Sequence, residues 1–331
     1  EYEDIVAEVG AKQDFSGLTF SWNGKHIPIF GTAAGLDKNC DVVGPLSHLF
    51  GFQEVGTIVV NQREGNNRPR VARDDANWNL YNAQGFPSKG LKYAKGKLQD
   101  YRSNRGNGFI LASICGIPPN EDGLDVAFEE TKILLRELSD LVDGFVWNPF
   151  SPNTAALKLL RNPETFREYG RLVKETSGSR LALVKMGPYD DVLEKREEWL
   201  DLVSGFMDCG GDGVVVVNTY RVPKEQIPSR EWGYDFAGVS GRFLVPYRDR
   251  AIRDVRRNFQ DVFIVGTGGI NSTNSAWSVL DSGANALEGY TPYTQKGFGL
   301  IGEMTKGIRE KLHIAGRDSL WNQSKVRNRL V

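Results

Sequence analysis

The chain has 331 residues, 40% of them hydrophobic, with 41 basic and 42 acidic side chains and a formal net charge of −1. This balance provides no concentrated basic face, so we expect no nucleic-acid partner, and no apolar run approaches the ~20 residues of a membrane-spanning helix. The three cysteines and three histidines are scattered, so we expect no disulfide framework and no metal site, and a cytoplasmic location is the simplest expectation.

The pattern divides the chain into three segments. Residues 1–26 form a polar N-terminal segment, and residues 27–314 have the pattern of an α/β domain. Residues 315–331 form a basic C-terminal tail, which we expect to be solvated. The sequence begins with Glu1 rather than Met, so it leaves open whether the native N-terminus is longer.

Eight short apolar runs alternate with segments of helical periodicity. Most of the runs are continuously hydrophobic, which is typical of parallel strands buried on both faces. Between them, Leu134, Leu138 and Leu141 form one helical stripe, and Trp199 with Val192, Val203 and Phe206 forms another. Eight strand–helix alternations predict an α/β fold, a closed (β/α)8 TIM barrel. The predicted strands are 27–35, 52–60, 108–115, 144–148, 181–186, 213–218, 262–266 and 286–290.

Two long connections interrupt this alternation, at residues 61–107 and 220–241. They follow the second and the sixth predicted strand. Loops after barrel strands lie at the catalytic end, so both connections are candidate lids or substrate walls. The alternative is decoration that takes no part in a site.

The residues that end the strands are candidates for chemistry, because a barrel gathers these ends at one face. They include two lysines, several amides and hydroxyls, and only one prominent acid, Asp37. This set suits a planar, polar, anionic ligand better than a metal, and it lacks the paired carboxylates of a glycosidase. The polar candidates are Lys38, Thr57, Ser113, Asn148, Ser151, Asn153, Lys185, Asn218, Thr219, Tyr290 and Thr291.

The glycine-rich segment 266–275, GTGGINSTNS, follows the seventh predicted strand. Glycines allow a ligand to approach the backbone closely, and Asn271, Ser272 and Thr273 are good N-cap residues for a following helix. A helix N-terminus beside Tyr290 and Thr291 predicts the phosphate site that is usual in such barrels. An ordinary glycine-rich turn is the alternative.

Two further features leave their roles open on residue chemistry alone. In the segment 148–153, NPFSPN, two prolines stiffen a turn that holds Ser151 between two amides. Ser151 either faces a ligand or caps the local backbone. Lys185 either stays charged beside an anionic cofactor, forms a Schiff base, or pairs with an acid.

Several motifs together resemble those of the dihydroorotate dehydrogenase family. Residues 32–39 read TAAGLDKN, residues 54–57 read EVGT, and residues 148–154 read NPFSPNT. Residues 184–185, 217–219, 239–241, 266–270 and 290–291 follow in the order of the family, and the resemblance spans about residues 17–311. Several motifs in the correct order are more specific than any one of them.

The resemblance implies a tightly but non-covalently bound FMN across the mouth of the 27–314 barrel. Lys185 would lie at the pyrimidine edge of the ring, where a positive charge stabilises the anionic reduced form. The implied FMN contacts are Ala34, Gly35, Thr57, Ser113, Asn148, Lys185, Gly241, Gly268, Gly269, Tyr290 and Thr291. The family often has Asn near the position of Ser113.

The resemblance also implies oxidation of dihydroorotate to orotate in pyrimidine biosynthesis. Ser151 would remove the proton from C5, and a hydride would pass from C6 to flavin N5. A serine base resembles the quinone-linked class, which makes a quinone a candidate electron acceptor. It also implies membrane association if an N-terminal extension has been removed, and a homodimer. The implied substrate contacts are Lys38, Asn148, Asn153, Asn218 and Thr219.

One departure keeps other functions open. Pro87 and Ser88 stand where the family usually has an Asn pair that helps to hold orotate, and proline has no amide donor. A first alternative is therefore an FMN oxidoreductase acting on another cyclic amide or enone. A Schiff-base lyase using Lys185 and a non-catalytic flavin-binding protein are further alternatives.

Overall fold

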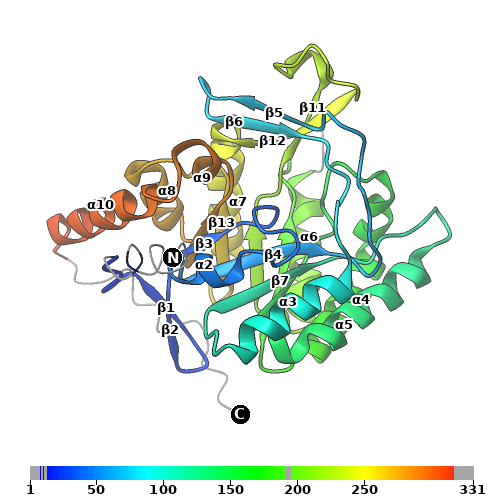
Figure 1. The fold of residues 1–331 in the computed structure, drawn as a ribbon, viewed down its shortest axis with the longest axis horizontal. Coiled ribbons are helices and arrows are strands. Elements are labelled where there is room, and N and C mark those ends of the chain that lie inside the picture. Colours follow the sequence, from blue (N-terminus) through cyan, green and yellow to red (C-terminus); the bar gives the residue numbers. More distant parts are fainter. Residues whose placement is uncertain (1–7, 9, 11–12, 191–194, 317–331) are drawn as a thin grey trace.

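The computed structural model describes residues 13–190 and 195–316, together with residues 8 and 10. Eight parallel strands close into a barrel in the order β10-β13-β14-β3-β4-β7-β8-β9, in which strands consecutive along the chain are neighbours (Figure 1). The predicted TIM barrel is confirmed. The strands are β3 (Phe30–Thr32), β4 (Phe52–Ile58), β7 (Phe109–Ile114), β8 (Gly144–Trp147), β9 (Leu181–Met186), β10 (Gly213–Val216), β13 (Phe263–Thr267) and β14 (Ala286–Gly289).

The first predicted strand, 27–35, is divided in the structure. Its beginning belongs to β2 (Lys25–Pro28), which pairs antiparallel with β1 (Thr19–Trp22), so a hairpin crosses the predicted segment boundary at residue 26. Phe20 of this hairpin packs against Phe52, Phe109 and Phe263, the first residues of three barrel strands. The hairpin therefore closes the N-terminal end of the barrel. A continuous apolar run gave no sign of this division.

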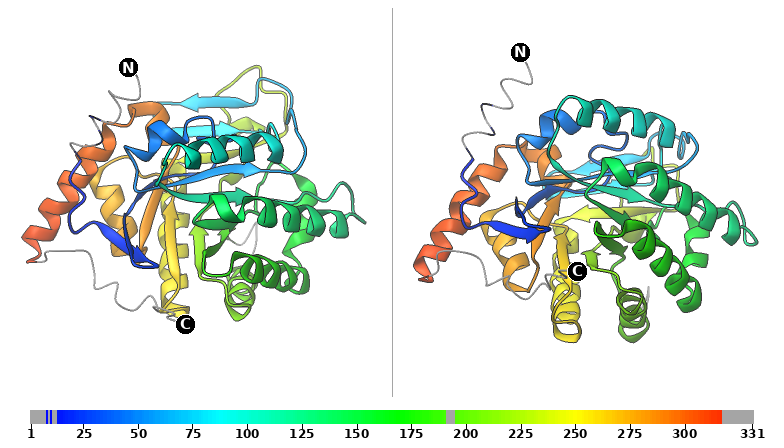
Figure 2. Two further views of the ribbon diagram at one scale, coloured as in Figure 1. Left: turned by 60° about the horizontal axis from the view of Figure 1, so that its bottom comes forward. Right: turned by 90° about the horizontal axis from the view of Figure 1, so that it is seen from below.

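Helices surround the barrel strands (Figure 2). The predicted stripes are confirmed in part: α4 buries Leu134 and Leu138, whereas Leu141 lies in the 3-10 turn η1 (Ser139–Leu141). In α6 the stripe is buried as predicted, and Val192 lies outside the described residues. The helices are α2 (Val43–Ser47), α3 (Leu91–Ser103), α4 (Leu124–Leu138), α5 (Pro163–Ser177), α6 (Arg196–Asp208), α7 (Val245–Asn258), α8 (Thr273–Asp281), α9 (Thr291–Lys296) and α10 (Leu300–Ile314).

The two long connections form one antiparallel sheet at the top of the molecule in Figure 1. The first contributes β5 (Val71–Asp74) and β6 (Asn79–Asn82), and the second contributes β11 (Tyr220–Pro223) and β12 (Phe236–Gly241). The strand order is β11-β12-β6-β5. We call this the cover sheet. It has its own small core, in which Tyr81, Val222, Trp232 and Val239 are buried.

Over the described ranges, no helix combines the length and the apolar character needed to cross a bilayer. In the same part of the chain, no group of three or more His, Cys, Asp or Glu side chains could hold a metal ion. The basic tail lies almost entirely outside the described residues, from residue 317 onward.

Candidate active site

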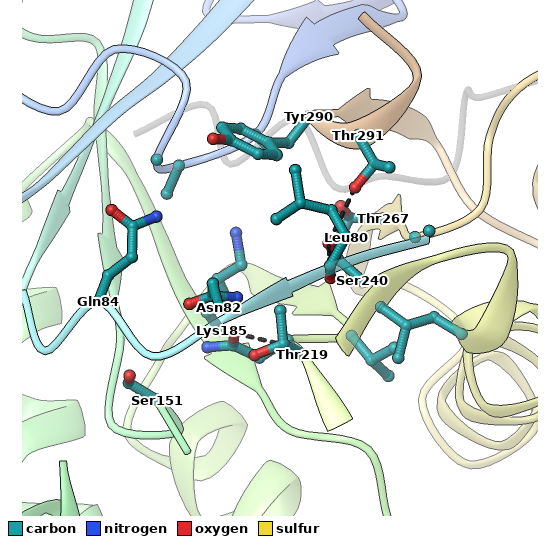
Figure 3. A pocket seen from close by; sticks show the side chains of 18 of the residues that line it. Leu80, Asn82, Gln84, Ser151, Lys185, Thr219, Ser240, Thr267, Tyr290 and Thr291 are labelled. Atoms are coloured by element: carbon teal, nitrogen blue, oxygen red, sulfur yellow. Dashed lines mark hydrogen bonds between the residues drawn. The ribbon is translucent and has the colours of Figure 1, made fainter. Parts of the chain in front are cut away.

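A pocket lies between the C-terminal ends of the barrel strands and the cover sheet. Every polar strand-end candidate and every FMN or substrate contact that the resemblance implies lines this pocket, except Ser113. In Figure 3, Ser151 lies at one side of the pocket, and Ser240 and Thr291 lie at the other.

Ser113 and Asp37 lie outside the pocket lining. Ser113 is fully buried, and its hydroxyl lies 3.0 Å from that of Thr57, so it supports the wall from behind. A direct contact of Ser113 with a ligand stays a prediction, and in this structure its side chain does not line the pocket. Asp37 accepts hydrogen bonds from the amides of Asp41 and Val42, at 2.8 and 3.0 Å, and so fixes the turn after β3.

The cover sheet supplies pocket residues that sequence reasoning missed. They come mainly from β6 and the loop behind it, where only the departure from the family pattern at Pro87 and Ser88 pointed to a ligand. Their proximity depends on the pairing of β6 with β12, in which Asn82 lies opposite Gly238 and Leu80 opposite Ser240. The additional lining residues are Ala33, Leu80, Asn82, Gln84, Gly85, Phe86, Pro87, Val217, Ser240, Leu244, Thr267, Ile270, Gly289 and Pro292.

A hydrogen-bond chain fixes two of the predicted amides. Asn148 Nδ2 donates to Thr57 Oγ1 at 2.9 Å, and Asn218 Nδ2 donates to Asn148 Oδ1 at 2.9 Å. The backbone amide of Thr219 donates to Asn218 Oδ1 at 2.8 Å. These bonds set the orientation of each amide, and both amides keep further hydrogen-bonding capacity for a ligand.

Asn153 links the loop after β8 to the cover sheet. Its Nδ2 donates to Asn82 Oδ1 at 2.7 Å, and Asn82 Nδ2 donates to the carbonyl of Gly238 at 3.0 Å. Asn153 Oδ1 is buried and has no donor among the described residues. Because a buried acceptor without a donor is costly, this oxygen is suited to accept a hydrogen bond from a ligand.

Side-chain packing and one hydrogen bond fix the loop that carries Ser151. Phe150 is buried against Phe166, and the guanidinium of Arg161 lies 4.4 Å from the centre of the Phe150 ring. Arg161 Nε also donates to the carbonyl of Pro149 at 3.2 Å. In the part of the chain that is described, Ser151 has no hydrogen-bond partner and no histidine lines the pocket.

Lys185 lies at the floor of the pocket between two carboxyl groups. Its Nζ is 2.7 Å from Glu54 Oε2 and 3.0 Å from Glu288 Oε1, and both glutamates are fully buried. Burial alone would lower the pKa of Lys185, but Glu288 and Glu54 outweigh it and raise that pKa above its ordinary value. Lys185 therefore stays protonated, which disfavours a Schiff-base role because that chemistry needs the neutral amine.

Lys38 is the other lysine of the pocket, and its surroundings are different. No carboxylate pairs with it among the described residues. Burial, and then the charge of Arg70, lower the pKa of Lys38 to about 8. Gly35 lies beside it with φ 101°, a backbone conformation that L side chains rarely adopt. A cation without a partner is suited to bind an anionic group.

The far end of the pocket has the character of an anion site. Gly268 and Gly269 have positive φ angles and expose their backbone to the pocket. The fully buried Arg248 donates to the carbonyl of Gly268, and the hydroxyls of Ser240 and Thr291 lie 2.8 Å apart.

The α8 terminus differs from the prediction. Its N-cap is Ser272, as the sequence indicated. However, Ser272 and Ser275 satisfy each other in a capping box, and residues 271–273 do not line the pocket. Because α8 begins only at Thr273, its N-terminus does not reach the pocket lining. The glycine turn itself forms this end of the wall.

The chain is similar to proteins of one family along most of its length. Residues 18–312 match the family described as dihydroorotate dehydrogenase. The "Dihydroorotate dehydrogenase (quinone)" of Nautilia profundicola is 32% identical over 85% of this chain and 76% of its own length. The protein of that name from Deinococcus radiodurans is 31% identical over 89% of this chain and 79% of its own length.

Solved structures agree on the fold. A crystal structure of ligand-free DHODH from Eimeria tenella superposes with a TM-score of 0.84 at 23% identity, and covers 99% of each chain. Together, the family match over residues 18–312 and the bacterial relatives at 31–32% identity decide the assignment. The chain belongs to the dihydroorotate dehydrogenase family.

Proposed function

We propose that this protein oxidises dihydroorotate to orotate with bound FMN. The observation that carries this proposal is the pairing, in one pocket, of an anion-binding end at Gly268 and Gly269 with a polar end at Ser151 and Lys38. A flat ring with a phosphate tail and an anionic cyclic amide fit these two ends. When bound, FMN would supply the hydride acceptor for C6 of the substrate.

The residues at the far end fit the phosphate of FMN. Gly268 and Gly269 line this end with backbone atoms, Ser240 and Thr291 offer hydroxyls, and the guanidinium of Arg248 donates to the carbonyl of Gly268. A fully buried arginine adds positive charge here, although Asp249 at 2.7 Å offsets part of it. We place the ring between the two ends, against Ala34, Gly35, Thr57 and Lys185, which also line the pocket.

The opposite end fits the substrate. Dihydroorotate carries a carboxylate and a ring with amide N–H and C=O groups. Lys38 supplies an unpaired cation for the carboxylate, and Asn153 Oδ1 supplies an acceptor without a donor for a ring N–H. Asn148, Asn218 and Thr219 supply amide and hydroxyl groups that are already oriented.

Ser151 is the residue that we assign as the base for the C5 proton. It lines the pocket on a rigid loop, and its hydroxyl is not engaged by any described residue. A serine hydroxyl is a weak base, so it needs a further group to take the proton. Because no described histidine lines the pocket, a water molecule is the acceptor that we propose.

The acceptor of the electrons that we propose is a quinone. The relatives from Nautilia profundicola and Deinococcus radiodurans carry "(quinone)" in their names. A homodimer and a membrane contact, which the resemblance implies, stay predictions.

A second candidate function rests on Pro87. This residue lines the pocket but offers no amide donor, while Ser88 is buried, does not line the pocket, and accepts from the amide of Gly90 at 3.1 Å. On the same loop, the side-chain amide that lines the pocket and stands nearest to Pro87 in the sequence is that of Gln84. An FMN oxidoreductase acting on a different cyclic amide or enone is therefore the alternative.

Anaerobic titration of the FMN-loaded protein with dihydroorotate tests the proposal. We expect the flavin absorption band to bleach. Ser151→Ala should retain FMN and bind orotate, but its flavin reduction should slow at least about tenfold, because general-base catalysis contributes that much or more. A flavin that binds but does not bleach in the wild-type protein would favour the second candidate. Unchanged reduction in Ser151→Ala would remove the serine from its assigned role.

A further inference from the structure

The floor of the pocket contains one lysine and two carboxyl groups, an imbalance of charge within the barrel interior. Lys185 projects from β9, Glu54 from β4 and Glu288 from β14, and each glutamate is fully buried. If both carboxyls were ionised, this triad would bury one uncompensated negative charge. Burial of an unpaired charge is strongly unfavourable, and a group in that position neutralises instead.

The hydrogen-bond pattern shows where a proton would fit. Lys185 uses one oxygen of each carboxyl group: Oε2 of Glu54 and Oε1 of Glu288. The amide of Ala34 donates to the same oxygen of Glu54, at 3.4 Å. The remaining oxygens, Glu54 Oε1 and Glu288 Oε2, are buried and receive no other donor from the described residues.

The two carboxyl groups are neighbours, because both lie within hydrogen-bond distance of the same Lys185 Nζ, at 2.7 and 3.0 Å. Two carboxylates have no donor between them, whereas one protonated carboxyl group would supply an O–H donor to the oxygens that lack a partner. The pKa values of Glu54 and Glu288 differ in the direction that one shared proton requires. Burial opposes ionisation of both, but Lys185 holds the pKa of Glu54 below its usual value, whereas burial and the charge of Glu54 raise that of Glu288.

We propose that Glu54 and Glu288 share one proton, so that the Glu54–Lys185–Glu288 triad has no net charge. The proton lies mainly on Glu288. Lys185 has three N–H donors and directs two of them to the carboxyls. The third is left for the pocket, so Lys185 acts as an oriented hydrogen-bond donor with a compensated charge. Glu54 and Glu288 are positioning residues for it.

A neutral triad changes the role that the family resemblance implies for Lys185. An uncompensated positive charge beneath a flavin would favour its reduced form strongly. A neutral triad gives a smaller effect and depends on the shared proton. Only this last step rests on the proposed function, because it requires the ring to lie over Lys185.

Infrared spectroscopy of the flavin-free protein tests the shared proton directly. At neutral pH we expect the carbonyl stretch of a protonated carboxylic acid, and we expect Glu288→Gln to abolish it. Glu54→Gln should abolish it as well, because Glu288 would then ionise as the only partner of Lys185. Asp254→Asn is the matched control: this buried carboxylate pairs with Arg196, has a lowered pKa, and contributes no such band.

The pH dependence of stability gives a second readout. A carboxyl group whose pKa is raised on folding takes up a proton, so its stability contribution is present at low pH and is lost as pH rises toward the folded pKa. The Tm of Glu288→Gln should therefore increase relative to wild type from about pH 5 to about pH 8. The other titratable groups that face Glu288 are Glu54, Lys185 and Tyr293, and burial and Glu288 raise the pKa of Tyr293, so it stays neutral here.

The infrared band and the pH dependence of Tm each give a result that would contradict the shared proton. The proposal is wrong if the wild-type band is absent, if it survives in either glutamine variant, or if the Tm difference does not change with pH. If Glu288→Gln does not fold, the band in Glu54→Gln decides the matter. In the FMN-loaded protein, Glu288→Gln should leave the reduction potential of the flavin unchanged at neutral pH. A higher potential in this variant would show that Glu288 is ionised in the wild-type protein. A protein that binds no FMN would overturn the proposed function, but the infrared test would still apply.

Discussion

Lys38 gives the pocket a cation whose charge depends on pH near neutrality. Its pKa of about 8 follows from burial and from Arg70, and no carboxylate among the described residues compensates it. Binding of an anionic ligand requires the protonated form. The affinity for orotate should therefore be constant below about pH 7 and fall about tenfold for each pH unit above about 8.

The measurement for Lys38 is the dissociation constant of orotate across pH, followed by the change in the flavin spectrum. Lys38→Arg should flatten the profile if the larger side chain is accommodated, because a guanidinium does not deprotonate in this range. Lys89→Arg, at an exposed pair with Asp41, is the control and should leave the profile unchanged. An affinity in the wild-type protein that does not vary between about pH 7 and pH 9 would contradict the assignment.

Sequence reasoning found Lys185 but not its two partners. Glu54 and Glu288 are 131 and 103 positions away from it along the chain, and only the closed barrel brings them together. The sequence signal is a glutamate inside each of two mostly apolar predicted strands, 52–60 and 286–290. Such a residue is costly in a buried strand unless it has a partner, so each glutamate predicts an opposite charge nearby. In the sequence, Glu54 stands out only as part of the motif EVGT.

At the scale of elements, the cover sheet is a separate packing unit above the barrel. Trp232 is 1% exposed, its Nε1 donates to the carbonyl of Phe236 at 3.1 Å, and its ring contacts Tyr234 edge-on. Trp232→Ala should weaken this unit by about 3–5 kcal/mol, as is usual for a buried aromatic. Amide hydrogen exchange in β11 and β12 should accelerate, and FMN should dissociate faster.

The barrel strands should keep their protection from exchange in Trp232→Ala, because Trp232 belongs to the small core and not to the main one. Trp277→Ala in α8 is a matched control, since that side chain packs against the main core. Equal acceleration of exchange in β11 and in barrel strand β9 would show that the cover sheet is not a separate unit.

The positions of the two connections were predictable, but their pairing was not. Their lengths and their places after the second and sixth strands were enough to locate them at the catalytic end. The register that joins them pairs Asn82 with Gly238, which are 156 positions apart. Pairing of strands at such separation depends on tertiary contacts that local pattern does not contain. The residues Leu80, Asn82 and Gln84 were missed for this reason.

At the scale of the whole molecule, the closed barrel explains why most site residues could be found from sequence. All eight strand ends meet at one face whatever the exact register, so chain order alone gathers Lys38, Asn148 and Lys185. Ser113 shows the limit of this argument. Its side chain lies one layer behind the pocket wall, and the depth of a side chain depends on packing that a list of strand ends does not contain.

The barrel also separates stability from function along its axis. Phe20 is 2% exposed at the N-terminal end, with ring centres 6.0, 6.0 and 4.9 Å from those of Phe52, Phe109 and Phe263. Phe20→Ala should lower the free energy of unfolding by about 3–5 kcal/mol, measured by denaturant titration. KM for dihydroorotate should not change, because the pocket lies at the opposite ends of the same strands. His26→Ala, at an exposed position of β2, should change neither quantity. A changed KM in Phe20→Ala would show that the two ends of the barrel are coupled.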